Sequence, residues 1–233
     1  MKINICIPTL YGHRTNSYLP QVVNLLIKQL ESSKQEYTIT TIGRKNPDYD
    51  SFSNPKVIKK YAGGIEGIHT VNGLNAEIEA MDGEDFACFY HDDLFIDYTD
   101  WPKMFVDIYN IDKLKCGVLG VVSHSQSVMG YIGANLFQCS YVNGNFFTKA
   151  KYIKCGFDPE LAEECGDIDL CNEQMINYRK NYIVGLPHRH YMTPYSITFS
   201  YLKDFKEDIG RCRKYLNEKW LKKVPGNDWS KYA

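Results

Sequence analysis

The chain has 233 residues, of which 44% are hydrophobic and 24% are charged, and its 27 Lys and Arg against 28 Asp and Glu give a formal net charge of −1. These values are typical of a globular protein with one large domain or two small ones, and they exclude disorder over most of the length. Proteins that bind phosphate backbones usually have a basic excess, so the charge balance disfavours nucleic acid as a partner.

The sequence predicts neither a membrane-spanning helix nor a secretory leader. No apolar run reaches the ~18 residues that a transmembrane helix needs, and the apolar stretch at Met1–Pro8 is short and lacks a small-residue cleavage site. Eight cysteines are present without a C-x-x-C pair. We interpret them as small buried side chains in a reducing, cytoplasmic compartment, with a zinc site or a disulfide framework as the alternative.

Predicted strands and helices alternate through the first half of the chain. Apolar periodicity and turn residues predict, in chain order, a strand at Lys2–Pro8, a helix near 19–31, a strand at Tyr37–Ile42, a loop at Arg44–Pro55, a strand at Val57–Tyr61, a helix near 65–81 and a strand at Phe86–Tyr90.

The alternation continues through the second half. The predicted elements are a helix at Trp101–Tyr109, strands at Cys116–Val122 and Tyr141–Phe147, helices near 149–154 and 167–181, and a strand at Tyr182–Leu186. This order predicts an α/β/α sandwich with a mainly parallel, Rossmann-like central sheet. Such sheets bind ligands outside the carboxyl ends of their strands.

A different composition marks residues 202–223, which have an apolar stripe and more Lys and Arg than Asp and Glu. The preferred interpretation is a terminal amphipathic helix that packs on the domain with a solvated basic face. The alternative is peripheral contact with a membrane surface or an acidic acceptor. Gly210 lies in the middle of the stripe and disfavours one long continuous helix.

The segment His91-Asp92-Asp93 directly follows an apolar strand-like run. Two adjacent carboxylates repel each other unless a cation offsets their charge, and hard oxygen ligands suit Mg²⁺ or Mn²⁺. The segment therefore predicts a site for a divalent ion that neutralises substrate phosphates. The alternative is a solvated turn that caps a helix.

Two further segments could contribute chemistry. Asp167 lies at a predicted helix start, where a carboxylate either caps the helix or acts as a general base. After the last predicted strand, His188 and His190 flank Arg189. An imidazole there could bind a metal and the guanidinium could face phosphate, although a surface loop is the alternative.

The order of these segments resembles a family-2 glycosyltransferase with the GT-A fold. The resemblance covers about residues 3 to 190. It rests on the opening strand and its Pro-Thr turn, on the helix that leads into the acidic turn, on His91-Asp92-Asp93 at the position of the Asp-x-Asp motif, and on an acceptor-side signature, at Ile3–Thr9, Gly64–Phe86, His91–Asp93 and Asn143–Leu170 respectively.

The resemblance implies an inverting transfer of a sugar from a nucleotide-diphosphate donor to a hydroxyl of a glycan or other acceptor, with Mn²⁺ or Mg²⁺ as cofactor. It implies a GT-A-like catalytic domain at 1–200, with a nucleotide-binding half at about 1–97 and an acceptor-binding half at about 98–200, followed by a helix and tail at 201–233.

The same resemblance implies the site residues. Asp167 is the expected base, with Glu163 or Glu164 as substitutes. Metal ligands are expected among Asp93, Asp92 and His190, with His188 as the alternate to His190. Nucleotide contacts are expected at Pro8, Thr9, Leu10, Gly64 and Asp92.

This sequence departs from the family pattern at three places. The first Asp of the motif is His91, no acidic residue ends the second predicted strand, and Gly166 replaces a Glu beside the base. These departures leave open a GT-A-like module that binds a glycan or partner without catalysis. A sugar-nucleotide nucleotidyltransferase is a further alternative, although Tyr11–Arg14 is a poor phosphate loop.

Overall fold

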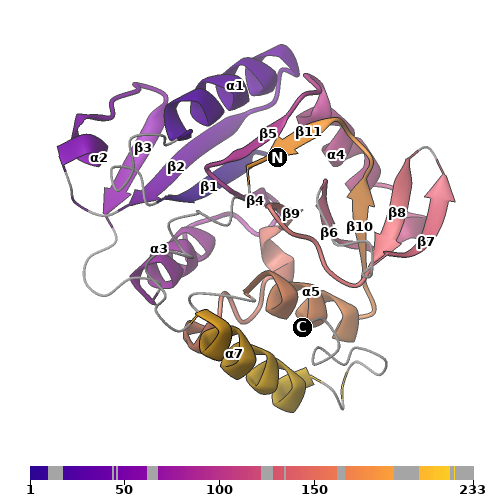
Figure 1. The fold of residues 1–233 in the computed structure, drawn as a ribbon. Coiled ribbons are helices and arrows are strands. Elements are labelled where there is room, and N and C mark those ends of the chain that lie inside the picture. The colour runs from indigo at the N-terminus through magenta and orange to yellow at the C-terminus, as the bar shows by residue number, and fades with distance from the viewer. Residues whose placement is uncertain are drawn as a thin grey trace.

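The structure is a computed structural model that describes residues 1–9, 18–43, 45, 47–61, 68–121, 128–133, 135–161, 166–191, 205–220 and 223. A nine-stranded sheet lies at its centre, in the order β3-β2-β1-β4-β9-β6-β10-β8-β7 (Figure 1). Its strands are β1 (Ile3–Thr9), β2 (Tyr37–Gly43), β3 (Val57–Tyr61), β4 (Phe86–Tyr90), β6 (Cys116–Gly120), β7 (Val128–Gly133), β8 (Leu136–Cys139), β9 (Asn145–Lys149) and β10 (Lys180–Val184).

The strand pairings give this sheet a dominant direction. Parallel pairs join β3 to β2, β2 to β1, β1 to β4 and β6 to β10. Antiparallel pairs place β9 and β8 against the direction of the other seven strands. The predicted α/β architecture with a mainly parallel central sheet is confirmed.

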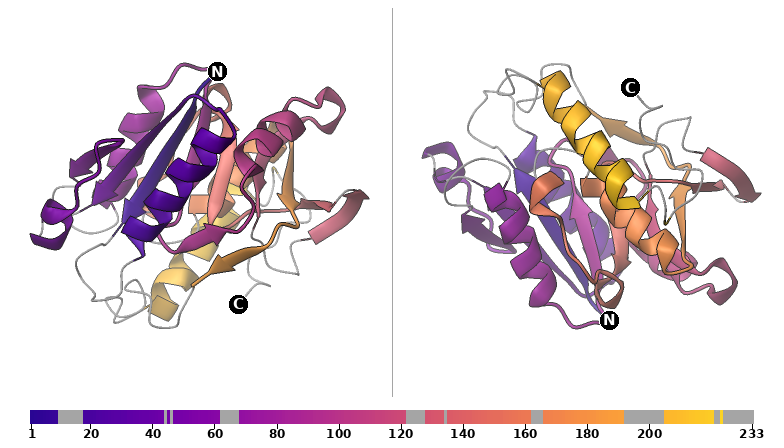
Figure 2. Two further views of the ribbon diagram at one scale, coloured as in Figure 1. Left: turned by 90° about the horizontal axis from the view of Figure 1, so that it is seen from above. Right: turned by 90° about the horizontal axis from the view of Figure 1, so that it is seen from below.

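Helices cover both faces of the sheet, as Figure 2 shows from above and below. On one face lie α1 (Leu19–Ser32) and α4 (Trp101–Tyr109), and on the other lie α3 (Ile68–Glu79), α5 (Gly166–Ile176) and α7 (Phe205–Trp220). Successive side chains of a strand point to opposite faces, so each central strand contributes to two cores. On β4, Phe86, Cys88 and Tyr90 pack on the α1 side, whereas Ala87 and Phe89 pack on the α5 side.

A buried polar link joins α1 and α4 to the segment that follows β4. The indole Nε1 of Trp101 donates to Gln29 Oε1 at 2.9 Å, and Gln29 Nε2 donates to the carbonyl of Ile96 at 2.7 Å. Ile96 ends β5 (Leu94–Ile96), which pairs with β11 (His188–His190) in a separate two-stranded sheet. This link fixes β5 against the helical layer.

Several elements differ from the sequence-based predictions. In place of a helix at 149–154, β9 extends to Lys149 and a 3₁₀ turn follows at Ala150–Tyr152, because β9 pairs with β4 along its whole length. The helix expected at 167–181 ends at Ile176, and Tyr178 adopts a φ of 60°, which turns the chain into β10. The expected loop at Arg44–Pro55 contains a short helix, α2 (Pro47–Ser51).

Other boundaries also moved. The strand expected at Tyr141–Phe147 corresponds to β9, which begins at Asn145 and ends at Lys149. Two short 3₁₀ turns occur at Asp112–Leu114 and Pro159–Leu161. Gly210 does not interrupt α7. A Cβ at Gly210 would meet no atom within 4 Å, so this position is open. The missing side chain costs helix propensity only, and the packing of α7 outweighs that cost.

The described cysteines are free thiols. Cys155 is exposed, and the others are buried among apolar side chains, at Cys6, Cys88, Cys116, Cys139, Cys171 and Cys212. Cys165 lies outside the described residues. Among the helices that the structure describes, none combines the length and apolar composition needed to cross a bilayer.

Candidate functional site

The segment His91-Asp92-Asp93 forms a tight turn at the carboxyl end of β4. The strand is buried along its length and lies between β1 and β9 at the middle of the sheet. The amide of His91 donates to the carbonyl of Gly144 at 2.9 Å, and the carbonyl of His91 accepts from the amide of Leu94 at 3.3 Å. The turn is therefore held at both ends.

The β5–β11 pair brings a distant segment to this turn. In the antiparallel register, His190 is opposite Leu94 and Arg189 is opposite Phe95. The amide of Tyr191 then donates to the carbonyl of Asp93 at 3.2 Å. His190 consequently lies beside Asp93.

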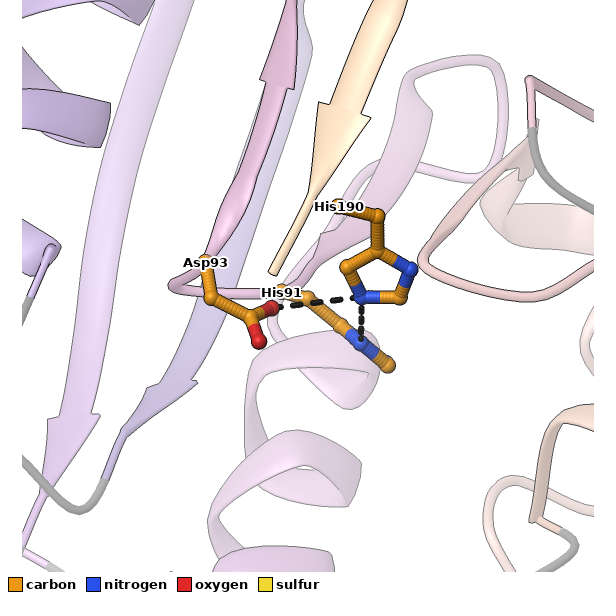
Figure 3. A group of neighbouring side chains, drawn as sticks. All are labelled: His91, Asp93 and His190. Atoms are coloured by element: carbon orange, nitrogen blue, oxygen red, sulfur yellow. Dashed lines mark hydrogen bonds and ion pairs between the residues drawn. The ribbon is translucent and has the colours of Figure 1, made fainter. Parts of the chain in front are cut away.

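Three potential metal ligands converge here (Figure 3). The Nε2 atom of His190 lies 3.2 Å from Oδ1 of Asp93 and 3.1 Å from Nδ1 of His91. One ligand atom from each of the three residues lies within 4.8 Å of the other two, and no other such group occurs among the described residues. The group combines two imidazoles with one carboxylate.

The contacts within this group fit a cation. The Nε2 atom of His190 holds at most one proton and cannot donate it to both Asp93 and His91. If that proton is instead on Nδ1, then Nδ1 has no acceptor, because it is buried and has no hydrogen-bond partner in the described part of the chain. A divalent ion between the three atoms would accept all three lone pairs at once.

The electrostatic environment gives two of these side chains the protonation states that ligands need. Burial and the neighbouring His190 ring lower the pKa of His91 to about 4, so this imidazole is neutral at pH 7. Burial acts to raise the pKa of Asp93, but the hydrogen bond and the charge attraction of His190 outweigh it and leave that pKa below its ordinary value. A neutral imidazole and an ionised carboxylate are the forms that bind metals.

Asp92 faces a different neighbour. Its carboxylate accepts a hydrogen bond from the hydroxyl of Thr9, the last residue of β1. Burial raises the pKa of Asp92 to about 6, although the Thr9 hydrogen bond opposes this shift. Asp92 is not in the three-residue group, and it joins the carboxyl ends of β1 and β4.

Asp167 lies in the first turn of α5. Its Oδ1 accepts a hydrogen bond from the amide of Ile168 at 2.8 Å. Burial raises the pKa of Asp167 to about 6, and the backbone hydrogen bonds offset only part of that effect. A carboxyl group with a pKa in this range can take up and release a proton near neutral pH.

Gly166 has a packing reason for its small size. A Cβ at this position would lie 3.2 Å from Cδ1 of Phe157, closer than an ordinary van der Waals contact. Phe157 packs edge-to-face on Phe89 of β4 with ring centroids 4.7 Å apart, and its amide donates to Asn75 Oδ1 at 2.7 Å. The start of α5 is therefore packed through one aromatic ring against the strand that leads to His91.

Of the other predicted site residues, none that the structure describes joins the group of His91, Asp93 and His190. Pro8 is the penultimate residue of β1, whereas Leu10, Gly64, Glu163 and Glu164 lie outside the described residues. His188 is exposed, and its Nδ1 lies 2.9 Å from the carbonyl of Leu186, so it does not join His190. Arg189 forms a bidentate pair with Asp97 at 2.8 and 2.9 Å and lies over the ring of Phe95.

Sequence reasoning missed His91 as a candidate ligand because the family pattern has an aspartate at that position. Its position after a buried strand was the available signal. The partner ring of His190 could not be placed beside it from sequence, because β5 and β11 have three residues each and show no measurable periodicity.

Comparisons with known proteins address the fold. No family model matches this sequence, and no curated protein matches it. Among solved structures, S. aureus TarS has a TM-score of 0.60 and 16% identity over 99% of this chain and 41% of that chain. A putative glucose-1-phosphate thymidylyltransferase from Bacillus anthracis, in complex with a sucrose, has a TM-score of 0.54 and 17% identity over 88% of this chain and 96% of that chain.

A third similar structure is the catalytic domain of Drosophila β1,4-galactosyltransferase 7 in complex with xylobiose. It has a TM-score of 0.52 and 10% identity over 83% of this chain and 72% of that chain. A variant of this galactosyltransferase was solved with manganese, UDP-Gal and xylobiose. This chain spans less than half the length of the first TarS structure. At sequence identities this low, structural similarity shows the fold alone. It identifies the nine-stranded sandwich as a Rossmann-like GT-A fold.

Proposed function

We propose that this chain is a metal-dependent glycosyltransferase that moves a sugar from a nucleotide-diphosphate sugar to a hydroxyl of a glycan or other acceptor. The supporting observation is the convergence of His91, Asp93 and His190 at the carboxyl end of β4. That edge of an open α/β sheet is where such folds bind their ligands.

The three converging residues would hold the divalent ion. Two imidazole nitrogens and one carboxylate suit a first-row transition ion better than Mg²⁺, which prefers oxygen ligands, so the proposal takes Mn²⁺. When bound, the ion supplies Lewis-acid stabilisation of the charge on the leaving diphosphate. His190 lies in the proposed acceptor half and Asp93 in the proposed donor half, so the site would join the two.

The end of β1 would hold the nucleotide. In the proposal, Pro8, Thr9 and Leu10 contact it together with Gly64. The hydroxyl of Thr9 donates to Asp92, which is adjacent to the ligand Asp93. This hydrogen bond would keep the nucleotide-binding end of β1 in register with the metal-binding turn.

Asp167 would act as the general base of an inverting transfer. The acceptor oxygen attacks the anomeric carbon from the face opposite the leaving group, the bond from that carbon to the diphosphate oxygen breaks, and the acceptor proton passes to the Asp167 carboxylate. The raised pKa of Asp167, about 6, supports this role because it makes the carboxylate a stronger base than an exposed aspartate.

Titration calorimetry with nucleoside diphosphates, with and without Mn²⁺, tests the site directly. We expect Mn²⁺ to tighten the binding of one nucleoside diphosphate at least tenfold in the wild type, and His190→Ala to lose this gain. The matched control is His188→Ala, which removes an exposed imidazole from the other end of the same strand and should behave as the wild type.

Turnover assays separate the alternatives. A glycosyltransferase releases nucleoside diphosphate from a sugar nucleotide, and this release should depend on Mn²⁺ and fall strongly in Asp167→Asn. Pyrophosphate release from a nucleoside triphosphate and a sugar 1-phosphate would instead identify a nucleotidyltransferase. Nucleotide affinity that ignores Mn²⁺, without turnover of any donor, would favour the non-catalytic binding module.

A further inference from the structure

The C-terminal helix α7 packs against the sheet face that also holds α5. Its inward side chains are buried in one apolar cluster with Leu170 and Cys171 of α5, at Cys212, Leu216 and Trp220. Figure 2 shows α7 lying across this face beside α5. The described part of the apolar stripe predicted for residues 202–223 therefore packs inside the protein.

Polar contacts connect α7 to the first turn of α5. The indole Nε1 of Trp220 donates to Asp169 Oδ1 at 2.5 Å, and Lys219 Nζ donates to Asp169 Oδ2 at 3.0 Å. Lys219 also donates to Asp158 Oδ2 at 2.6 Å, and the hydroxyl of Tyr215 donates to the same oxygen at 2.8 Å. These five side chains, Asp158, Asp169, Tyr215, Lys219 and Trp220, form the α5–α7 contact group.

Two members of the contact group, Asp169 and Trp220, are buried, and the other three are partly buried. Asp169 is 3% exposed, and an ionised carboxylate at such a position is costly unless donors surround it. The single ammonium of Lys219 serves two carboxylates, Asp158 and Asp169. Loss of Lys219 therefore weakens the attachment of α5 and of the Asp158 segment together, whereas loss of the Trp220 indole weakens that of α5 alone.

Helix geometry relates this attachment to Asp167. Side chains two positions apart on an α-helix differ by about 200° around its axis. Asp169 points to α7, so Asp167 lies on nearly the opposite side of the same first turn. The bonds to Asp169 restrain the rotation of this turn, and that rotation sets the direction in which the Asp167 side chain leaves the helix.

We propose that α7 positions the catalytic base, with Asp169, Lys219 and Trp220 as positioning residues that hold the first turn of α5. The proposal rests on the proposed glycosyltransferase function and on the role of Asp167 in it. It assigns to the C-terminal helix a part in catalysis that requires no contact with substrate.

The test uses the full chain and three α7 variants. Trp220→Phe removes the indole donor but keeps an aromatic ring, Lys219→Met removes the charge but keeps the stem, and Lys214→Met is the matched control on the exposed side of α7. We expect the first two to lower kcat about 10- to 100-fold, since misplacement of a reacting group by about 1 Å can cost this much. The Kd for Mn²⁺ with nucleoside diphosphate should stay within about twofold in all three. Lys219→Arg should restore most of kcat.

Amide hydrogen exchange provides a readout that needs no substrate. Amides of the first turn of α5 should exchange faster in Trp220→Phe and Lys219→Met, whereas those of β4 should not change. Unchanged exchange in α5 would overturn the proposal, even if no sugar donor turns over and the proposed function fails. Faster exchange with wild-type kcat would also overturn it, because α7 would then stabilise α5 without positioning the base. If one variant does not fold, the other decides.

Discussion

Replacing Asp167 by Asn is expected to stabilise the protein at neutral and alkaline pH while it removes the proposed base. The Asp167 carboxylate is buried enough to raise its pKa from 3.8 to about 6. Between these values the folded state binds more protons than the unfolded state. The free energy of unfolding of the wild type therefore falls as pH rises through this window, and the loss is complete above about pH 6.

The size of the effect follows from the shift. One pKa unit corresponds to about 1.36 kcal/mol, so a shift of about two units costs the ionised folded state about 2–3 kcal/mol after allowance for water near the carboxylate. Asparagine is nearly isosteric with aspartate, has no charge, and keeps an oxygen that can accept the hydrogen bond from the Ile168 amide. A gain of this size would raise Tm by roughly 5–10 °C for a domain of this length.

Thermal unfolding of both proteins between pH 4 and pH 8 measures the effect, with Asp100→Asn as the control for loss of an exposed carboxylate. We expect the Tm difference between Asp167→Asn and the wild type to grow from near zero at pH 4 to its full value above pH 6. A difference that is flat with pH, or a variant that is less stable at pH 8, would refute the reasoning.

Three further predictions concern packing, a buried hydrogen bond and the metal. Gly120→Ala should lower the free energy of unfolding by about 3 kcal/mol in denaturant titrations, because its Cβ would lie 2.2 Å from Val142 Cγ1, whereas Gly130→Ala, with no atom within 4 Å of its Cβ, should change it by less than about 0.5 kcal/mol. Trp101→Phe leaves Gln29 Oε1 without its donor and should cost about 1–3 kcal/mol in the same assay; no loss would show that the bond is dispensable. Mn²⁺ at about 100 times its Kd should add about 2.7 kcal/mol of stability to the wild type, reversibly with a chelator, and none to His190→Ala.

The sequence determined the elements whose signal is local. The helices α1 and α4 follow from apolar residues at helical spacing, and their predicted starts agree with the structure because Leu19 and Trp101 open buried stripes. The apolar run at Phe86–Tyr90 likewise predicted β4, since a buried central strand needs apolar side chains on both faces. The alternation of these elements was sufficient for the fold class.

Tertiary pairing overrode local preference elsewhere. Residues 149–154 favour a helix by composition, yet the ladder with β4 keeps the chain extended to Lys149. In α7 the reverse holds, because burial of Leu216 and Trp220 outweighs the cost of Gly210. For residues other than proline, local patterns report a preference of at most about 1 kcal/mol per residue, which is less than the gain of about 1.5–3 kcal/mol from burying one large side chain.

For the candidate site, the sequence by itself determined which residues follow a buried strand and therefore that Asp92 and Asp93 lie at the carboxyl edge of the sheet. Only the tertiary structure decided that Asp92 faces Thr9, that His190 contacts both Asp93 and His91, and that Asp169 faces α7. Each of these contacts joins segments far apart in the chain. Periodicity reports which face of its own element a side chain occupies, whereas the partner on that face is set by how the elements pack.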